Sequence, residues 1–331
     1  MKFHKLGRTG QDISVICLGT MTFGEQNSQA DGFEQMDYAL EQGVNFFDTA
    51  ELYSVPPRAE TTGSTERIIG EWFSARGTRN KVILASKVAG AGAFAFMRDK
   101  QEPTRLNRAQ MTEALDKSLK RLRTDHIDLY QIHWPERPMQ WGSNPTSFHV
   151  TTHDETTSVA QQLDVLDGFV RAGKVRWLGL SNESAWGAMS FLKESDTRGL
   201  ARMQSVQNAY SLINRTFETA LAEVAMREQL GLLAYSPLAQ GYPPANTKMA
   251  RCPRDRARPC STACNATRNR APISPSMPIW LWHESMGSTP PRWRSHSSIR
   301  GPSLRPTSSA QRRCYSCGRP LPRSMSMSPP I

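Results

Sequence analysis

Four ionisable side chains stand at or just after short apolar runs: Asp48, Tyr53, Lys87 and His133. Singly, each has an ordinary structural explanation, such as a capping aspartate or a surface tyrosine, but their recurrence at corresponding positions favours a shared function. A tyrosine beside a lysine can donate a proton near neutral pH, because the ammonium group favours the phenolate and lowers the pKa of the phenol. Asp48 would keep the lysine charged, and His133 would supply a second hydrogen bond to the same oxygen. The set is typical of an enzyme that protonates a carbonyl oxygen as hydride reaches the carbon.

These side chains need a scaffold that brings distant segments together, and the hydropathy pattern predicts one. Between short apolar runs lie segments of helical period. One of them, 159–170, precedes Gly173, where a C-terminal cap would lie, and another opens with Asn107 and Gln110 at the spacing of a capping box. Seven of the apolar runs are candidate parallel strands: 15–18, 46–50, 82–87, 128–134, 177–182, 205–210 and 231–236.

Strict alternation of strands and helices indicates a parallel sheet, either doubly wound or closed as a (β/α)8 barrel. The first strand is not followed by the Gly-x-Gly-x-x-Gly fingerprint of a Rossmann fold. Residues 2–16 contain Gly7 and Gly10 between apolar stretches, which predicts a hairpin that could close the bottom of a barrel. We therefore expect an α/β fold, a (β/α)8 TIM barrel with an N-terminal β-hairpin and without a recognisable eighth strand. In such a barrel the active site lies at the carboxyl ends of the strands, where the four ionisable residues stand.

Several longer motifs extend this pattern, and together they resemble the aldo-keto reductase superfamily, in particular its bacterial Tas-type branch. The resemblance runs from residue 1 to about residue 241. It is carried by Gly19–Gly24, Phe47–Tyr53, Ala85–Val88, Asp128–Trp134, Ala172–Arg176, Gly179–Glu183, Gln207–Ser211 and Leu233–Leu238.

The resemblance implies reduction of an aldehyde or ketone to an alcohol by hydride transfer from NADPH. Tyr53 would be the general acid, Asp48 and Lys87 would tune it, and His133 would orient the carbonyl. Read without the family, Ser181–Asn182 is a plain strand-to-helix turn and Tyr235 a core aromatic. The cofactor-binding residues that the resemblance implies are Gly19, Thr20, Met21, Ser181, Asn182, Gln207, Tyr235, Ser236 and Leu238.

Two long connections, 89–106 and 135–157, lie on the same predicted face, and loops of this length are usually functional or disordered. Their aromatic residues beside Trp134 predict an apolar mouth for a small carbonyl substrate, with Trp134, Trp141 and Phe148 in the pocket. The second loop also carries two histidines, but no third ligand stands at metal-binding spacing, so no metal is expected.

The composition changes abruptly after residue 241. Residues 242–331 carry 15 basic and two acidic side chains, 15 of the 22 prolines, and neither valine nor phenylalanine. We therefore predict two parts: an incomplete aldo-keto reductase barrel over 1–241 and a basic Arg/Pro/Ser-rich tail over 242–331 that cannot build a packed core and is disordered. Such a shift is what out-of-frame translation of a GC-rich gene produces, which predicts a frameshift near codon 242.

The tail has two other interpretations, a zinc module and a nucleic-acid-binding arm. Cys314 and Cys317 form one ligand pair without a second at zinc-ribbon spacing, and the arginines are scattered among prolines without an RNA-binding motif. We expect neither zinc nor a specific nucleic-acid partner.

The start of the chain lacks the apolar region of a signal peptide, and no apolar run approaches the length of a membrane span. Cys17 is the only cysteine before residue 252, as expected in a reducing compartment. The sequence thus predicts a cytoplasmic enzyme without a membrane partner and leaves its oligomeric state open. The alternative function is a catalytically impaired barrel that acts as a binding or regulatory subunit.

Overall fold

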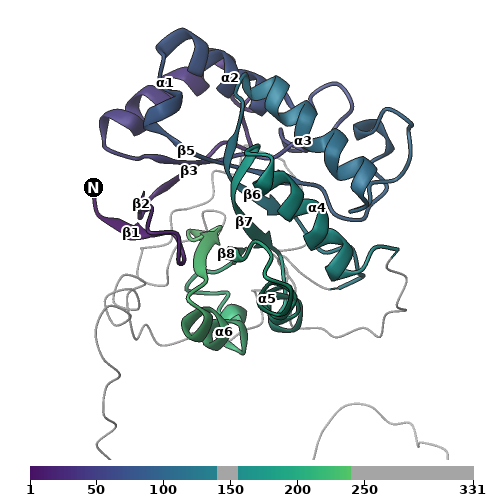
Figure 1. Ribbon diagram of the computed structural model, residues 1–331. Coiled ribbons are helices and arrows are strands. Elements are labelled where there is room, and N and C mark those ends of the chain that lie inside the picture. Colours follow the sequence, from purple (N-terminus) through teal and green to yellow (C-terminus); the bar gives the residue numbers. More distant parts are fainter. Residues whose placement is uncertain (140–155, 240–331) are drawn as a thin grey trace, which may run out of the picture. The chain divides into compact units, whose positions relative to one another are not determined.

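The computed structural model describes residues 1–139 and 156–239, and their main feature is a parallel sheet wrapped by helices (Figure 1). Seven parallel strands pair in chain order, each with the next. They are β3 (Cys17–Gly19), β4 (Phe46–Asp48), β5 (Ile83–Val88), β6 (Ile127–Ile132), β7 (Val175–Ser181), β8 (Met203–Ala209) and β9 (Gly231–Tyr235). The described residues contain no eighth parallel strand. The predicted incomplete (β/α)8 barrel is therefore confirmed, and the doubly wound alternative is wrong, because the strand order never reverses.

The N-terminal hairpin is also confirmed. Strands β1 (Phe3–Lys5) and β2 (Asp12–Ser14) pair antiparallel. The turn between them contains Gly7, whose φ is +51°. A side chain there would be strained, and its Cβ would lie 2.4 Å from the backbone carbonyl oxygen of Gln204 in β8. Glycine thus lets the hairpin approach the sheet closely.

Helices follow the strands in alternation and cover the outer face of the sheet (Figure 1). The helices are α1 (Gln29–Glu41), α2 (Ser64–Arg76), α3 (Arg108–Leu122), α4 (Val159–Arg171), α5 (Ala185–Arg198) and α6 (Leu221–Glu228), with short 3-10 turns at Arg79–Lys81, Ala95–Met97 and Thr216–Glu218. Large apolar residues such as Trp72, Leu84 and Leu166 form the main core between helices and sheet. None of the described helices is long and apolar enough to span a membrane.

The helix ends test the predicted capping signals. Asn107 caps α3 by accepting from the amide N–H of Gln110, as predicted. The reciprocal half of the predicted capping box is wrong, because the side-chain oxygen Oε1 of Gln110 accepts from the amide N–H of Arg105 and from Arg98 Nε, and the side chain does not reach back to Asn107. After α4 the chain continues through Gly173 with a φ of +72°, which confirms the glycine at its C-terminus.

Side chains on the inner face of the sheet form two layers. In the lower layer Phe46, Ala85 and Leu129 pack with Leu6 and Ile13 of the hairpin segment. This buried apolar cluster is how the hairpin closes the lower end of the sheet.

The next inward position on each of these strands lies two residues further along, because side chains alternate between the two faces of a strand. That step gives Asp48 on β4, Lys87 on β5 and Gln131 on β6, and all three are buried. A polar layer therefore lies directly above the apolar one, at the carboxyl ends of the strands. The predicted boundary between 1–241 and 242–331 falls outside the described residues.

Candidate active site

The structure brings together the four side chains that the sequence analysis selected. Asp48 ends β4, Lys87 lies near the end of β5, His133 directly follows β6, and Tyr53 lies in the loop after β4. Lys87 Nζ donates to Asp48 Oδ2 at 2.5 Å and to the carbonyl oxygen of Thr49 at 2.9 Å. It also lies 3.3 Å from the Tyr53 hydroxyl oxygen. A buried ammonium group is thus held by a carboxylate and directed at a phenol.

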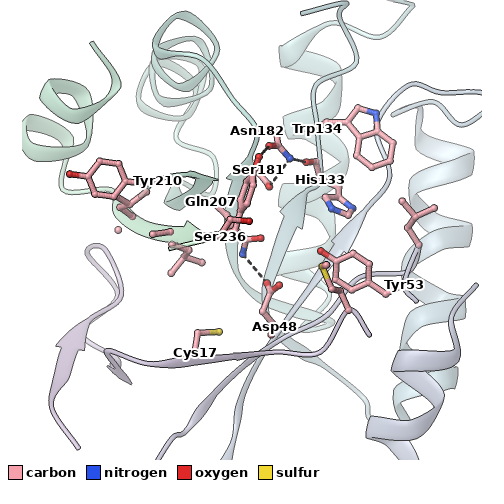
Figure 2. Close-up of a pocket in the computed structure, with 18 of the residues that line it drawn as sticks. Cys17, Asp48, Tyr53, His133, Trp134, Ser181, Asn182, Gln207, Tyr210 and Ser236 are labelled. Atoms are coloured by element: carbon pink, nitrogen blue, oxygen red, sulfur yellow. Dashed lines mark hydrogen bonds between the residues drawn. The ribbon is translucent and has the colours of Figure 1, made fainter. Parts of the chain in front are cut away.

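His133 also lies beside the tyrosine. The two ring centroids are 5.5 Å apart with planes at 85°, an edge-to-face arrangement that Figure 2 shows. The His133 amide N–H donates to the carbonyl oxygen of Val88, which fixes the residue to the end of β5. Its Nδ1 is buried and has no hydrogen-bond partner among the described residues. The imidazole therefore makes no competing hydrogen bond through that atom.

Burial and charge set the protonation states of these groups. Burial lowers the pKa of Lys87, but the nearby Asp48 carboxylate and the contact with Tyr53 outweigh it, and the pKa is raised. Burial, with a smaller contribution from Lys87, lowers the pKa of His133 well below 6.5. At neutral pH the site thus holds an ammonium group beside a neutral imidazole.

The sequence analysis expected Lys87 to lower the pKa of Tyr53 below its ordinary value, and that direction is wrong. Burial raises the pKa of the phenol above its ordinary value of 10.0, and the ammonium group of Lys87 offsets only part of this rise. The hydroxyl is therefore protonated at neutral pH, which suits a group that must donate a proton.

Two glutamine side chains hold the other oxygen of the Asp48 carboxylate. Gln131 Nε2 donates to Asp48 Oδ1 at 3.0 Å, and Gln207 Nε2 donates to the same atom at 2.9 Å. Gln131 was not selected from the sequence, although its position two residues before His133 on a strand was a usable signal. Gln207, which was selected for the cofactor, has its amide group turned toward Asp48 (Figure 2).

The residues assigned to the cofactor on β7 and β9 form a chain of hydrogen bonds. The Tyr235 hydroxyl donates to Asn182 Oδ1 at 2.7 Å. Asn182 Nδ2 in turn donates to the carbonyl oxygen of His133 at 2.9 Å and to Ser181 Oγ at 3.3 Å. Asn182 has a φ of +52°, so the chain turns sharply as it leaves β7. These hydrogen bonds connect the predicted cofactor residues to the backbone of His133.

A cavity of about 1930 Å³ is lined both by residues selected for catalysis and by residues selected for the cofactor. Its lining also includes Leu6, Ile13 and Phe46 of the lower layer, so the cavity extends beyond the carboxyl ends of the strands. Its described lining includes the selected residues Gly19, Thr20, Met21, Asp48, Tyr53, His133, Trp134, Ser181, Asn182, Gln207, Tyr235 and Ser236. Leu238 is 80% exposed and does not belong to this lining.

Aromatic side chains flank the cavity next to His133. Trp134 and Phe94 both line it, and their ring centroids are 5.7 Å apart. They belong to a small apolar cluster with Leu52, Ala89 and Met97. The other two selected pocket residues, Trp141 and Phe148, lie outside the described residues, as do the two histidines considered for a metal. Within the described ranges no three His, Cys, Asp or Glu side chains are grouped to hold a metal ion.

A parallel barrel-type sheet with tyrosine, lysine, aspartate and histidine at its carboxyl ends defines a class of carbonyl-reducing oxidoreductases. The chain belongs to the aldo/keto reductase family, whose model matches residues 15–277. This match continues past the boundary that the composition predicts at residue 241. The chain is therefore an oxidoreductase of a family that uses NADH or NADPH to reduce carbonyl groups of small molecules.

Individual relatives support the Tas-type resemblance. "Protein tas" of Escherichia coli (strain K12) is 46% identical over 245 residues, which cover 73% of this chain and 69% of that protein. "Uncharacterized oxidoreductase YrpG" of Bacillus subtilis (strain 168) is 37% identical over 243 residues, covering 73% of this chain and 68% of the relative. Among solved structures, the thermostable aldo-keto reductase Tm1743 in complex with the inhibitor epalrestat superposes with a TM-score of 0.56 at 28% identity, covering 73% of this chain and 74% of that one.

Proposed function

We propose that this chain reduces an aldehyde or ketone to an alcohol with NADPH, and that Tyr53 is the general acid. The observation that carries this proposal is the contact of 3.3 Å between the Tyr53 hydroxyl and the Lys87 ammonium group, which is itself paired with Asp48. An ammonium group at this distance stabilises negative charge on the phenolic oxygen as the proton leaves. The phenol is thus protonated at rest and its conjugate base is stabilised during the reaction.

The other residues of the site orient the substrate. His133 is a neutral imidazole, so it donates a hydrogen bond to the carbonyl oxygen without repelling the neighbouring ammonium group. Two donors, Tyr53 and His133, then share the oxygen on which negative charge develops. Lys87 and Asp48 do not touch the substrate in this scheme and act through the phenol.

The residues of the cavity fit a nicotinamide dinucleotide. Bound NADPH would supply the hydride. Ser181, Asn182 and Gln207 offer the hydroxyl and amide groups that a carboxamide needs, and Tyr235 offers an aromatic ring beside them. We assign the remaining cofactor contacts to Gly19, Thr20, Met21 and Ser236, which line the cavity, and on the resemblance alone to Leu238, which lies outside the described lining.

The substrate part of the proposal is an apolar or aromatic carbonyl compound. Trp134 is only 7% exposed and lies beside Phe94 on the cavity wall, next to His133. We include Trp141 and Phe148 in the same pocket on the strength of the sequence alone. Because these groups are apolar, they favour a hydrophobic substituent on the carbonyl carbon.

The composition of residues 242–331 differs sharply from that of the preceding part of the chain. We propose that they are a separate part of the chain, translated out of frame, and that the barrel ends near residue 241. The reaction would take place in the cytoplasm, where a chain with the single free cysteine Cys17 among its described residues remains reduced.

The experiment is a spectrophotometric assay of NADPH oxidation at 340 nm with 4-nitrobenzaldehyde and the full chain. Aldehyde-dependent oxidation that is lost in Tyr53→Phe, with NADPH binding retained in that variant, supports the proposal. Retained NADPH binding without any aldehyde-dependent oxidation by the unaltered chain would instead favour the binding or regulatory subunit.

A further inference from the structure

A buried ion pair lies directly behind the catalytic loop. Glu51, between Asp48 and Tyr53, is 2% exposed, and Arg98 is 1% exposed. The Arg98 guanidinium group donates two parallel hydrogen bonds to the Glu51 carboxylate: Nη1 to Oε2 at 2.9 Å and Nη2 to Oε1 at 2.9 Å. Neither residue belongs to the described lining of the cavity, so neither contacts the substrate or cofactor in the proposed reaction.

Glu51 connects the segment that carries Tyr53 to the strand that carries Lys87. Its amide N–H donates to the carbonyl oxygen of Lys87 at 3.2 Å. Its side-chain Oε1 accepts from the amide N–H of Ala89 at 2.8 Å. One residue thus holds the end of β5 at Lys87 and at Ala89, the residue that directly follows the strand.

Arg98 connects the same carboxylate to the rest of the fold. Arg98 Nε donates to Gln110 Oε1 at 3.2 Å, and Gln110 lies in the first turn of α3. Arg98 also stands at the end of the loop turn Ala95–Met97, which packs with Trp134 and Phe94. The ion pair therefore joins the catalytic loop, the end of β5, the start of α3 and the aromatic wall.

The physical character of this pair indicates a role in geometry rather than in stability. Removing two charges from water costs as much free energy as the pair recovers, so well-packed apolar residues often stabilise a protein equally well. A bidentate arginine, however, fixes both the position and the orientation of a carboxylate. Here the carboxylate belongs to the loop that positions the phenol.

We propose that Glu51 and Arg98 are positioning residues for the reaction, which hold the Tyr53 loop and the end of β5 together so that the phenol and the Lys87 ammonium group stay in contact. This inference rests on the proposed function of Tyr53. A misplacement of about 1 Å can cost about 100-fold in rate, so a small movement of the loop suffices for a large effect.

The chain offers a matched control at the opposite end of the same strand. Asp128 is fully buried, and its Oδ2 accepts from Arg79 Nη2 at 2.9 Å and from the amide N–H of Leu84 at 2.9 Å. It therefore repeats the arrangement of a buried carboxylate, an arginine and an amide of β5. Leu84 lies near the start of β5, whereas Lys87 lies near its end and Ala89 directly follows it. Asp128 also accepts from Arg176 Nη1 through Oδ1 at 2.8 Å, so the control differs from Glu51 in this second arginine as well as in its distance from the site.

The experiment uses three test variants of the full chain: Glu51→Gln, Arg98→Met, and a double variant that combines Glu51→Leu and Arg98→Met. The control variant is Asp128→Asn. We expect kcat to fall at least about tenfold in the first three, with the NADPH dissociation constant changed less than about twofold. The alkaline limb of kcat should move to higher pH, because a more distant Lys87 lowers the pKa of the phenol less. Asp128→Asn should lower the melting temperature and leave kcat and its pH profile unchanged.

Two results would overturn the inference. One is an equal loss of kcat in Glu51→Gln and Asp128→Asn. The other is a double variant that regains the melting temperature and kcat together, because the pair would then be structural only. A double variant that regains stability and stays slow supports positioning.

Amide hydrogen exchange separates this inference from the proposed function. If the unaltered chain reduces no carbonyl compound, the proposed function fails, but exchange still decides whether the pair holds the end of β5. Glu51→Gln should accelerate exchange across 87–98 at least about tenfold, whereas Asp128→Asn should not. Equal exchange rates in the two variants would contradict the inference without reference to activity.

Discussion

Two successive layers of side chains fill the inner face of the sheet, and they differ completely in chemistry. The lower layer is apolar and packs Phe46, Ala85 and Leu129 against the hairpin segment. The upper layer, two residues further along the same strands, is Asp48, Lys87 and Gln131. A single step of the strand repeat thus separates the residues that hold the fold from the residues that carry the proposed chemistry. Substitutions in the two layers should have separable effects.

The largest expected effect is on turnover, from the substitution Lys87→Met in the polar layer. It removes the ammonium group that stabilises the Tyr53 phenolate and leaves the Asp48 carboxylate buried beside two amides. We expect kcat for carbonyl reduction to fall at least about 100-fold, in the range that general acid catalysis contributes. Steady-state kinetics with NADPH and an aromatic aldehyde would measure this, and a variant within about threefold of the parent kcat would contradict the role of Lys87.

The matching substitution in the apolar layer is Leu129→Ala, two residues before Gln131 on β6. Leu129 is fully buried, and truncation should cost about 2–5 kcal/mol of unfolding free energy. As a control, Leu232→Ala on β9 truncates a partly exposed residue and should cost less. Urea denaturation compares the two, and kcat of the folded Leu129→Ala enzyme should stay close to that of the parent. A similar stability loss in both variants would mean that the layer is not the main anchor of the hairpin.

A smaller effect is expected from pH, and its sign follows from the two shifted groups. Reduction uses the protonated phenol, and burial raises the pKa of Tyr53 above 10.0. The pKa of His133 lies well below 6.5, so this group does not change its charge between pH 7 and pH 9. We therefore expect kcat for reduction to stay level up to about pH 10 and to fall above it. A fall centred below about pH 9 would show that Lys87 outweighs burial.

The smallest expected effect is the preference between the two cofactors. The resemblance to aldo-keto reductases implies that the groups holding the 2′-phosphate of NADPH would come from residues after 241, in the segment that we propose is translated out of frame. We expect the dissociation constants of NADPH and NADH to differ by less than tenfold, which corresponds to about 1.4 kcal/mol. Fluorescence titration measures both constants. A larger preference for NADPH would mean that arginines of 242–331 form a phosphate site.

The elements could be predicted because their signals are local. The strand runs around Phe46, Leu84 and Leu129 and the glycine turn at Gly7 depend on neighbouring residues only, and the structure has strands and a turn at those places. The four polar residues at strand ends could be selected for the same reason. The Asn107 cap was predicted correctly, but the side chain of Gln110 was not, because Arg98 and Arg105 compete for it from outside the helix.

The contacts that span the barrel could not be predicted in this way. The two amides on Asp48 come from Gln131 and Gln207, which are 83 and 159 residues away along the chain. The Glu51–Arg98 pair joins residues 47 positions apart. The predicted direction of the Tyr53 pKa shift was wrong because the shift depends on how deeply the phenol is buried, which the sequence pattern does not give.

In the proposed reaction, hydride reaches a carbonyl carbon while Tyr53 protonates its oxygen. The most direct test incubates the full chain with NADPH deuterated at the reactive face of C4 and an aromatic aldehyde, and analyses the alcohol by mass spectrometry. We expect an alcohol with one deuterium on the carbinol carbon, formed over many turnovers by the parent chain and at least about 100-fold more slowly by Tyr53→Phe with undiminished NADPH binding. Labelled alcohol produced at the same rate by Tyr53→Phe, or none produced by the parent chain, would contradict it.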